Sequence, residues 1–139
     1  MRVNIIGKLL SKNSSEIKTR TAGILGEDEA VRVLKKMGYK IIERNFTVRG
    51  GEIDIIAKEG EYTCFVEVRM RKSNSYGTPA ETIDIRKQQR IIRAAQLYAM
   101  KNAIYDSPMR FDVVLINADS SGGKLKNKSV EVIQDAFRL

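Results

Sequence analysis

Acidic residues in two neighbouring apolar segments are the part of this sequence best suited to chemistry. Glu52 and Asp54 lie in the segment Gly51–Ile56, and Glu67 lies in Phe65–Arg69. A carboxylate inside such a β-type run costs several kcal/mol unless it is paired or binds a metal. These residue types therefore point to a site for a divalent cation or to ion pairs with basic side chains.

The turn between the two segments decides which carboxylates face each other. If Gly60 and Glu61 are the two loop residues of a β-hairpin, Asp54 lies opposite Glu67. A turn placed one residue earlier pairs Glu67 with Glu52 instead. In both registers two carboxylates share one face at about 5 Å between their Cβ atoms. Like charges at that distance repel, and a divalent cation removes the repulsion.

Phosphodiester chemistry is the function that such a pair favours. Mg²⁺ or Mn²⁺ held by Asp54 and Glu67 would neutralise charge on a phosphodiester and activate a water for in-line attack. Strand alternation puts Arg69 on the face of Glu67, where it would stabilise developing negative charge. The alternative is a salt-bridged surface in which Arg69 and Arg71 neutralise the two carboxylates.

Three other charged residues are candidates, each with a structural alternative. Glu27 could be a further metal ligand or could accept a hydrogen bond from a metal-bound water. The structural alternative is a residue near the helix N-terminus that the helix dipole favours. Lys87 either contacts the scissile phosphate or extends its charged end from the edge of the core. For Asp112, inside an apolar strand, we favour a structural ion pair with Arg44 or Arg110.

The charge distribution favours a nucleic-acid partner, and we expect DNA. The 139 residues include 25 Lys and Arg against 17 Asp and Glu, a net charge of +8, and the isoelectric point is near 9.7. Residues 69–93 hold seven basic and two acidic residues, next to the proposed acidic site. Such a rim suits a phosphate backbone, although a solvated helix face is the alternative. The candidate phosphate contacts are Arg71, Lys72, Arg86, Lys87 and Arg90.

Several classes of function are excluded by residues that the sequence lacks. There is no histidine, which excludes Ser-His-Asp and Cys-His catalysis. The single cysteine, Cys64, excludes an intrachain disulfide and a cysteine zinc cluster, and we expect it to be buried on the strand face opposite Glu67. No apolar run approaches the roughly 18 residues that span a bilayer, and no signal peptide is evident. We therefore expect a cytoplasmic protein without a membrane partner.

Apolar periodicity and turn residues predict a chain that alternates helices and strands. We expect residues 1–20 to form a basic, partly ordered arm and residues 21–139 to form a single domain. Thr21 is a candidate N-cap, and Thr78-Pro79-Ala80-Glu81 matches a capping box. The predicted helices cover 22–37 and about 78–102, and the predicted strands cover 40–48, 52–58, 62–70, 110–116 and, weakly, 129–133.

The C-terminal part of the chain gives weaker signals. Residues 119–128 are polar and contain glycine, which predicts a loop. The last residues are expected to be a short helix or a tail. The resulting order, α-β-β-β-α-β, predicts an α/β fold with a mixed sheet and helices packed against it.

Taken together, these segments resemble the YraN-like family of uncharacterised bacterial proteins. Through that family, the chain is similar to the PD-(D/E)XK nuclease superfamily, which has the restriction-endonuclease-like fold. The resemblance covers about residues 22–117 and rests on Gly26-Glu27, Ala30, Gly38-Tyr39, Arg44-Asn45, Gly51–Ile56, Phe65–Arg69, Gly77, Lys87 and Arg110–Val113.

The resemblance implies a three-layer nuclease-like core and maps the acidic pair of the superfamily onto Asp54 and Glu67. Glu27 matches the helix glutamate of Holliday-junction resolvases. The usual lysine of the superfamily is replaced by Arg69, which stays protonated and cannot act as a general base. Lys87 could supply the missing amine from the neighbouring helix.

Three hypotheses follow. The first is a metal-dependent DNA endonuclease, with branched or damaged DNA among its candidate substrates, and the set Glu27, Asp54 and Glu67 favours it. The second is a catalytically inactive nucleic-acid-binding module of the same fold, which Arg69 favours. The third is a scaffold that binds a protein partner. A resolvase-like role would favour a two-fold homodimer, whereas a monomer remains open.

Overall fold

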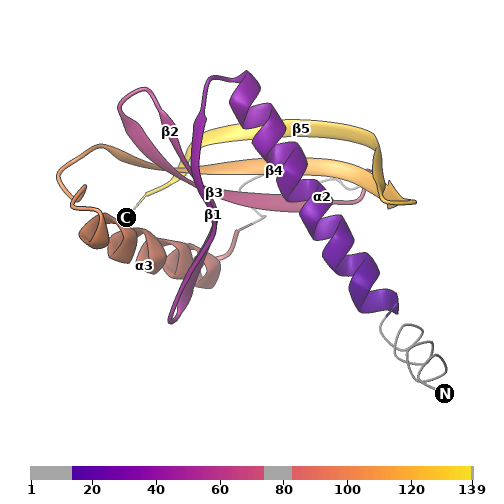
Figure 1. The fold of residues 1–139 in the computed structure, drawn as a ribbon, viewed down its shortest axis with the longest axis horizontal. Helices are drawn as coiled ribbons and strands as arrows, with labels where there is room; N and C mark the ends of the chain where they lie inside the picture. Colours follow the sequence, from indigo (N-terminus) through magenta and orange to yellow (C-terminus); the bar gives the residue numbers. More distant parts are fainter. Residues whose placement is uncertain (1–13, 74–82, 139) are drawn as a thin grey trace, which may run out of the picture.

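Five strands form one mixed sheet in the order in which they occur along the chain (Figure 1). In the computed structural model, residues 14–73 and 83–138 are described. Strands β3 and β4 are parallel and the other neighbours are antiparallel. The elements are α2 (Ser14–Lys36), β1 (Lys40–Val48), β2 (Gly51–Glu59), β3 (Tyr62–Arg71), α3 (Ile85–Lys101), β4 (Met109–Ser121) and β5 (Lys124–Phe137).

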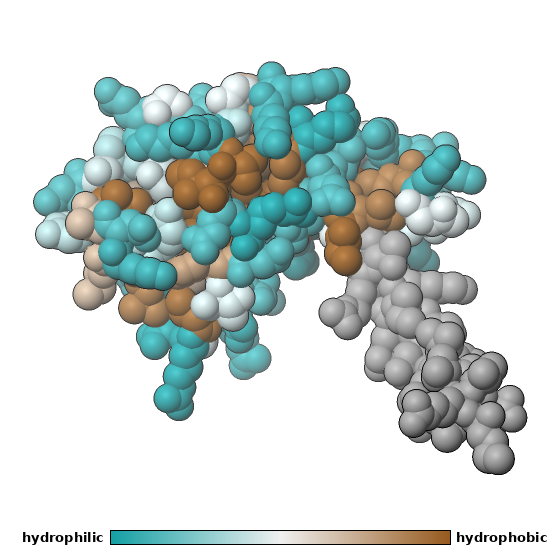
Figure 2. All heavy atoms as spheres, in the orientation of Figure 1, coloured by the Kyte–Doolittle hydropathy of each residue, from teal (hydrophilic) through white to brown (hydrophobic). Residues whose placement is uncertain are grey.

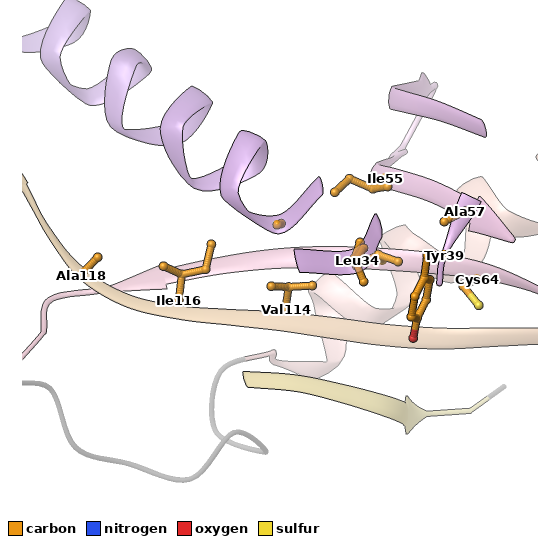
Figure 3. Close-up of a cluster of buried hydrophobic side chains, with 10 residues drawn as sticks. Leu34, Tyr39, Ile55, Ala57, Cys64, Val114, Ile116 and Ala118 are labelled. Atoms are coloured by element: carbon orange, nitrogen blue, oxygen red, sulfur yellow. The ribbon is translucent and has the colours of Figure 1, made fainter. Parts of the chain in front are cut away.

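The two helices cover opposite faces of the sheet, which gives the expected three-layer α/β core. Ala30 and Leu34 of α2 pack with Ile55, Val66 and other apolar strand residues on one face. Figure 3 shows Leu34 among residues of the strands and Tyr39. On the other face, α3 buries Ile91, Ala94, Ala95 and Tyr98 against a second cluster that contains Phe65 and Phe111. Because each face has a helix, the central strands are apolar on both sides.

The hairpin β2–β3 has the first of the two predicted registers. Ile55 pairs with Val66, and Glu59 pairs with Tyr62, so the loop consists of Gly60 and Glu61. Gly60 has a φ of +58°, a conformation that glycine adopts without the strain of a Cβ atom. This register directs Asp54 toward Glu67.

Strand β2 changes its partner arrangement at Asp54. The ladder with β3 ends at Ile55, while the pairing with β1 continues as far as Gly51. Ile53 packs in the α3 cluster but Ile55 packs in the α2 cluster, although a regular strand would place both on one face. The sheet therefore forks between β2 and β3, and Asp54 lies at the fork.

Several predicted boundaries are corrected. Helix α2 begins at Ser14, not after Thr21, and Figure 1 shows its first turns extending past the sheet. Helix α3 begins at Ile85 with Asp84 as its N-cap, and the expected cap at residues 78–81 lies outside the described residues. Residues 119–128 are not a loop, because β4 and β5 form a hairpin around Gly122 and Gly123, both at positive φ.

The end of the chain is also a strand, where a helix or tail was expected. β5 continues to Phe137, whose ring stacks on Phe111 at 4.8 Å between centroids. Its long pairing with β4 compensates for a weak apolar pattern. Hydrophilic side chains cover most of the face drawn in Figure 2, with hydrophobic residues visible only in patches. Within the described ranges, no helix is long and apolar enough to cross a membrane.

A buried polar network confirms the structural interpretation of Asp112. Its carboxylate is fully buried and binds Arg110 at 2.9 Å and 3.0 Å, as well as the Tyr39 hydroxyl at 2.8 Å. Arg44, the other candidate partner, binds Glu27 instead. Cys64 is buried on the α2 face as expected, and burial raises the pKa of its thiol to about 12.

Candidate functional site

Two carboxylates meet at the fork between β2 and β3, and we call Asp54 and Glu67 the acidic pair. The Asp54 carboxylate accepts a hydrogen bond of 2.8 Å from the backbone N–H of Val68, which would otherwise be a donor in the ladder. Glu67 is only 4% exposed. Its Oε2 atom is buried and has no hydrogen-bond partner among the described residues. An unpartnered buried carboxylate oxygen is rare in folded proteins and is suited to binding a proton or a cation.

The electrostatics of the acidic pair agree with that geometry. Burial raises the pKa of Glu67 to about 8; the charge of Asp54 also raises it, whereas that of Lys87 lowers it. Burial likewise raises the pKa of Asp54, although the hydrogen bond from Val68 opposes the change. The adjacent Glu67 carboxyl lowers the pKa of Asp54, whereas Asp54 raises that of Glu67. Near neutral pH the pair therefore retains a proton, which a divalent cation would have to displace.

Lys87 reaches the acidic pair from the first turn of α3. Its ammonium lies 3.0 Å from Glu52 Oε1 and 3.5 Å from Glu67 Oε1. Burial alone would lower the pKa of Lys87, but its hydrogen bond to Glu52 and the charge of Glu67 raise it on balance. The Asp84 carboxylate accepts the Lys87 N–H at 2.8 Å and so fixes the turn from which the side chain extends. The basic partner of the pair is Lys87, not Arg69 or Arg71 as the salt-bridge alternative required.

Arg69 is near the acidic pair but makes no ion pair with it. Its charge lowers the pKa of Glu67, and no carboxylate of the described residues lies within 4 Å of its guanidinium. Arg71 lies farther along β3 and donates to Asn117 at 3.2 Å. Arg69 therefore has no carboxylate partner among the described residues, whereas Arg71 is partly engaged within the sheet.

Glu27 lies on the α2 side of the same fork. With Asp54, Asn45 and Val68 it lines an open cleft of about 590 Å³. Its carboxylate accepts hydrogen bonds from Arg44 at 2.7 Å and from Asn45 at 3.0 Å. Glu27 thus faces the cleft of Asp54 but already has two donors on one oxygen.

Two residues of this site were not singled out as site residues by sequence reasoning. Glu52 was considered only as an alternative partner of Glu67, yet it binds Lys87. Asn45 lies opposite Asp54, between the pairs Arg44–Ile55 and Phe46–Ile53, and has a φ of +56°. Non-glycine residues seldom adopt this conformation, and asparagine does so more readily than most. The Glu-x-Asp spacing was a signal for Glu52, but nothing in the sequence marks the backbone of Asn45.

The acidic pair fits a cation that binds few protein ligands. Within residues 14–73 and 83–138, no group of three or more Asp, Glu or Cys side chains forms a ready-made metal cage. Mg²⁺ needs no such cage, since it keeps several waters and accepts one or two carboxylates together with phosphate oxygens. The unpartnered oxygen of Glu67 and the adjacent Asp54 supply that minimum. Glu27 would become a ligand only by releasing a donor.

The candidate nucleic-acid contacts lie on two elements beside the acidic pair. Lys72 is exposed at the end of β3, and Arg86 and Arg90 are exposed on α3. The segment that joins these elements, residues 74–82, lies outside the described residues. Lys87 differs from the other candidates because its ammonium is directed to carboxylates.

Sequence comparisons show which family this chain belongs to. The family described as "Uncharacterised protein family UPF0102" matches residues 26–116. A UPF0102 protein of Acetivibrio thermocellus is 46% identical over 128 residues, which cover 91% of this chain and 98% of the relative. One of Hahella chejuensis is 45% identical over 121 residues, or 87% and 93% of the two chains. The matched region contains Glu27, both members of the acidic pair and Lys87.

Proposed function

Because the chain belongs to the UPF0102 family, which is of the PD-(D/E)XK nuclease-like type, we propose that it is a metal-dependent nuclease acting on DNA. The observation that supports this most directly is the buried, incompletely satisfied acidic pair, Asp54 and Glu67. Mg²⁺ or Mn²⁺ would supply charge neutralisation at the phosphate and activation of a water.

The side chains around the pair have distinct roles in this proposal. Asp54 and Glu67 would hold the cation, with the Val68 N–H fixing the orientation of Asp54. Arg69, which has no carboxylate partner among the described residues, would bind the phosphate and stabilise its added negative charge. Lys87 would release Glu67 when the cation binds and would place its ammonium beside the leaving oxygen.

A second candidate function is a nucleic-acid-binding module that has lost catalysis. Two observations favour it: arginine stands where the superfamily usually has lysine, and the Lys87 ammonium already lies 3.5 Å from Glu67 Oε1. Such a module predicts salt-sensitive binding that needs no metal.

The test is cleavage of labelled linear, single-stranded, flapped and four-way DNA with Mg²⁺ or Mn²⁺. The wild-type protein is compared with the near-isosteric variants Asp54→Asn and Glu67→Gln. Glu61→Gln, an exposed residue of the β2–β3 loop, removes the same charge away from the site. We expect cleavage in the wild type and in Glu61→Gln, and its loss in the other two.

Calorimetric titration with Mn²⁺ provides a second readout. We expect Asp54→Asn and Glu67→Gln to weaken Mn²⁺ binding and Glu61→Gln to leave it unchanged. An unchanged affinity of Asp54→Asn and Glu67→Gln for Mn²⁺ would refute the assignment of the acidic pair as the metal site. Binding of DNA without cleavage under any condition would favour the inactive module.

A further inference from the structure

The exposed basic residues of α3 have no acidic partner among the described residues, unlike several other arginines of the described chain. Arg32, Arg44, Arg110 and Arg138 each form an ion pair with a carboxylate. Helix α3 contains five basic and no acidic residues over Ile85–Lys101. Of these five, only Lys87 reaches a carboxylate of the described residues.

Three of the arginines lie on one face of α3. Arg86, Arg90 and Arg93 are spaced by four and three residues, so their side chains follow one another along the helix surface. All three are exposed. Ile91, Ala94 and Tyr98 hold a neighbouring face of α3 against the sheet. This packing prevents the arginine face from turning inward.

The turn between β1 and β2 adds a fourth arginine to that face. The Arg93 Nε atom donates a hydrogen bond of 2.8 Å to the backbone carbonyl of Arg49. A Cβ atom on Gly50 would lie 3.2 Å from the same nitrogen, and one on Gly51 would lie 2.4 Å from the Arg90 carbonyl oxygen. The turn is therefore packed directly against α3, and Arg49, whose backbone contacts Arg93, is exposed. We call Arg49, Arg86, Arg90 and Arg93 the arginine ridge.

The arginine ridge leads to the acidic pair. The positive charge of Arg90 helps to lower the pKa of Glu52, after the larger effect of Lys87, so these groups lie within electrostatic reach of one another. Glu52 in turn binds Lys87, whose ammonium is 3.5 Å from Glu67. A strand bound along the ridge would thus arrive at the carboxylates.

Four like charges on one surface repel one another, and an anionic partner with regularly spaced charges removes that repulsion. From Arg86 to Arg93 the helix rises by about 10 Å at 1.5 Å per residue. This is close to the rise of three successive nucleotides in one strand of a duplex, at about 3.4 Å each. Guanidinium groups also bind phosphate in a two-pronged fashion that lysine cannot match.

We propose that the arginine ridge is a binding surface for the phosphate backbone of double-stranded nucleic acid, which it directs toward the acidic pair. The orientation toward the pair rests on the function proposed above, whereas the binding itself does not. The exposed aromatic residues of the described part, Tyr62 and Tyr105, lie outside the ridge. Among described residues the ridge thus has no platform for unstacked bases, which favours a duplex over a single strand.

The experiment measures binding to a labelled duplex and to the corresponding single strand by fluorescence anisotropy, in EDTA and over a series of salt concentrations. The variants are Arg86→Gln/Arg90→Gln and Arg49→Gln. The control, Lys35→Gln/Lys36→Gln, removes two exposed charges from the last turn of α2. Circular dichroism establishes that every variant is folded.

We expect the double ridge variant to reduce the slope of log K against log salt by about 2, and Arg49→Gln to reduce it by about 1. The control is expected to keep the wild-type slope and affinity, and the wild type to prefer the duplex. Equal slopes in the ridge and control variants would refute the proposal that the arginine ridge binds the phosphate backbone. A preference of the wild type for the single strand would refute the assignment of a duplex as the ligand. Because EDTA removes divalent cations, these outcomes do not depend on whether the protein cleaves DNA.

Discussion

At the scale of single residues, Glu67 is the side chain whose environment differs most from that of an ordinary carboxylate. One of its oxygens lacks a partner, and its other oxygen is 3.5 Å from the Lys87 ammonium. Burial raises its pKa from an ordinary value of 4.5 to about 8. The folded protein therefore holds a proton on this residue that the unfolded chain has lost over that pH range.

This pKa predicts how stability depends on pH. A raised pKa contributes stability that is complete below pH 4.5 and is lost as the pH rises to about 8. The loss amounts to several kcal/mol at about 1.4 kcal/mol per pKa unit. We expect the free energy of unfolding of Glu67→Gln, measured with urea between these pH values, to lack this decline.

Added Mg²⁺ tests the same residue, because it should increase the stability that is lost at high pH. A bound cation replaces the proton, so it should restore the stability of the wild type near pH 8 and leave Glu67→Gln unchanged. Glu61→Gln should behave like the wild type in both measurements. A wild-type protein whose stability is the same at pH 5 and pH 8 would contradict the proposed environment of Glu67.

At the scale of elements, the contact between the start of β2 and helix α3 holds Lys87 in place. The Gly51 backbone touches the Arg90 carbonyl and Ala94 without room for a side chain. The N-cap Asp84 then fixes the first turn of α3, where Lys87 begins. The position of the ammonium beside Glu52 and Glu67 thus depends on a glycine and a cap rather than on the lysine alone.

Gly51→Ala should therefore destabilise the protein and displace α3. Its Cβ atom would lie 2.4 Å from the backbone oxygen of Arg90, which cannot move without the helix. We expect a loss of about 1–3 kcal/mol in urea unfolding, typical of overpacking. Gly23→Ala is the control, because a Cβ atom there has no neighbour within 4 Å and alanine favours a helix. Equal stabilities of the two variants would refute the close contact.

At the scale of the whole molecule, stability and the candidate chemistry use different charged groups. The network of Arg110, Asp112, Tyr39 and Gln134 joins β4 and β5 to the connection between α2 and β1, where Tyr39 lies. All these groups have partners, whereas the acidic pair retains an unpartnered oxygen. A satisfied network fixes the fold, while the unsatisfied pair is available for a ligand.

Arg110→Met should be strongly destabilising without affecting the pair directly. It leaves the fully buried Asp112 carboxylate without its cation, which costs about 3–5 kcal/mol. The companion variant Asp112→Asn and the double variant complete a thermodynamic cycle in urea. We expect a large coupling energy between the two residues, and additive losses would contradict their pairing.

The sequence by itself determined the main elements and much of the site. Apolar alternation and turn residues were sufficient for β1, β2 and β3, and they limited the β2–β3 hairpin to two registers, of which the structure has the one that directs Asp54 toward Glu67. Asp112 was correctly interpreted as half of an ion pair. These features depend on local periodicity and on the cost of burying charge, which neighbouring residues in the chain express directly.

Only the tertiary structure decided which charges meet. Lys87 is 35 residues from its partner Glu52, and Glu27 is held by Arg44 from another element. The fork at Asp54, the left-handed Asn45 and the length of β5 arise from pairing between strands, which no single segment encodes. Periodicity specifies which face of an element is buried. The partner of a charged side chain depends instead on how the layers are stacked, because the stacking sets the distances between elements.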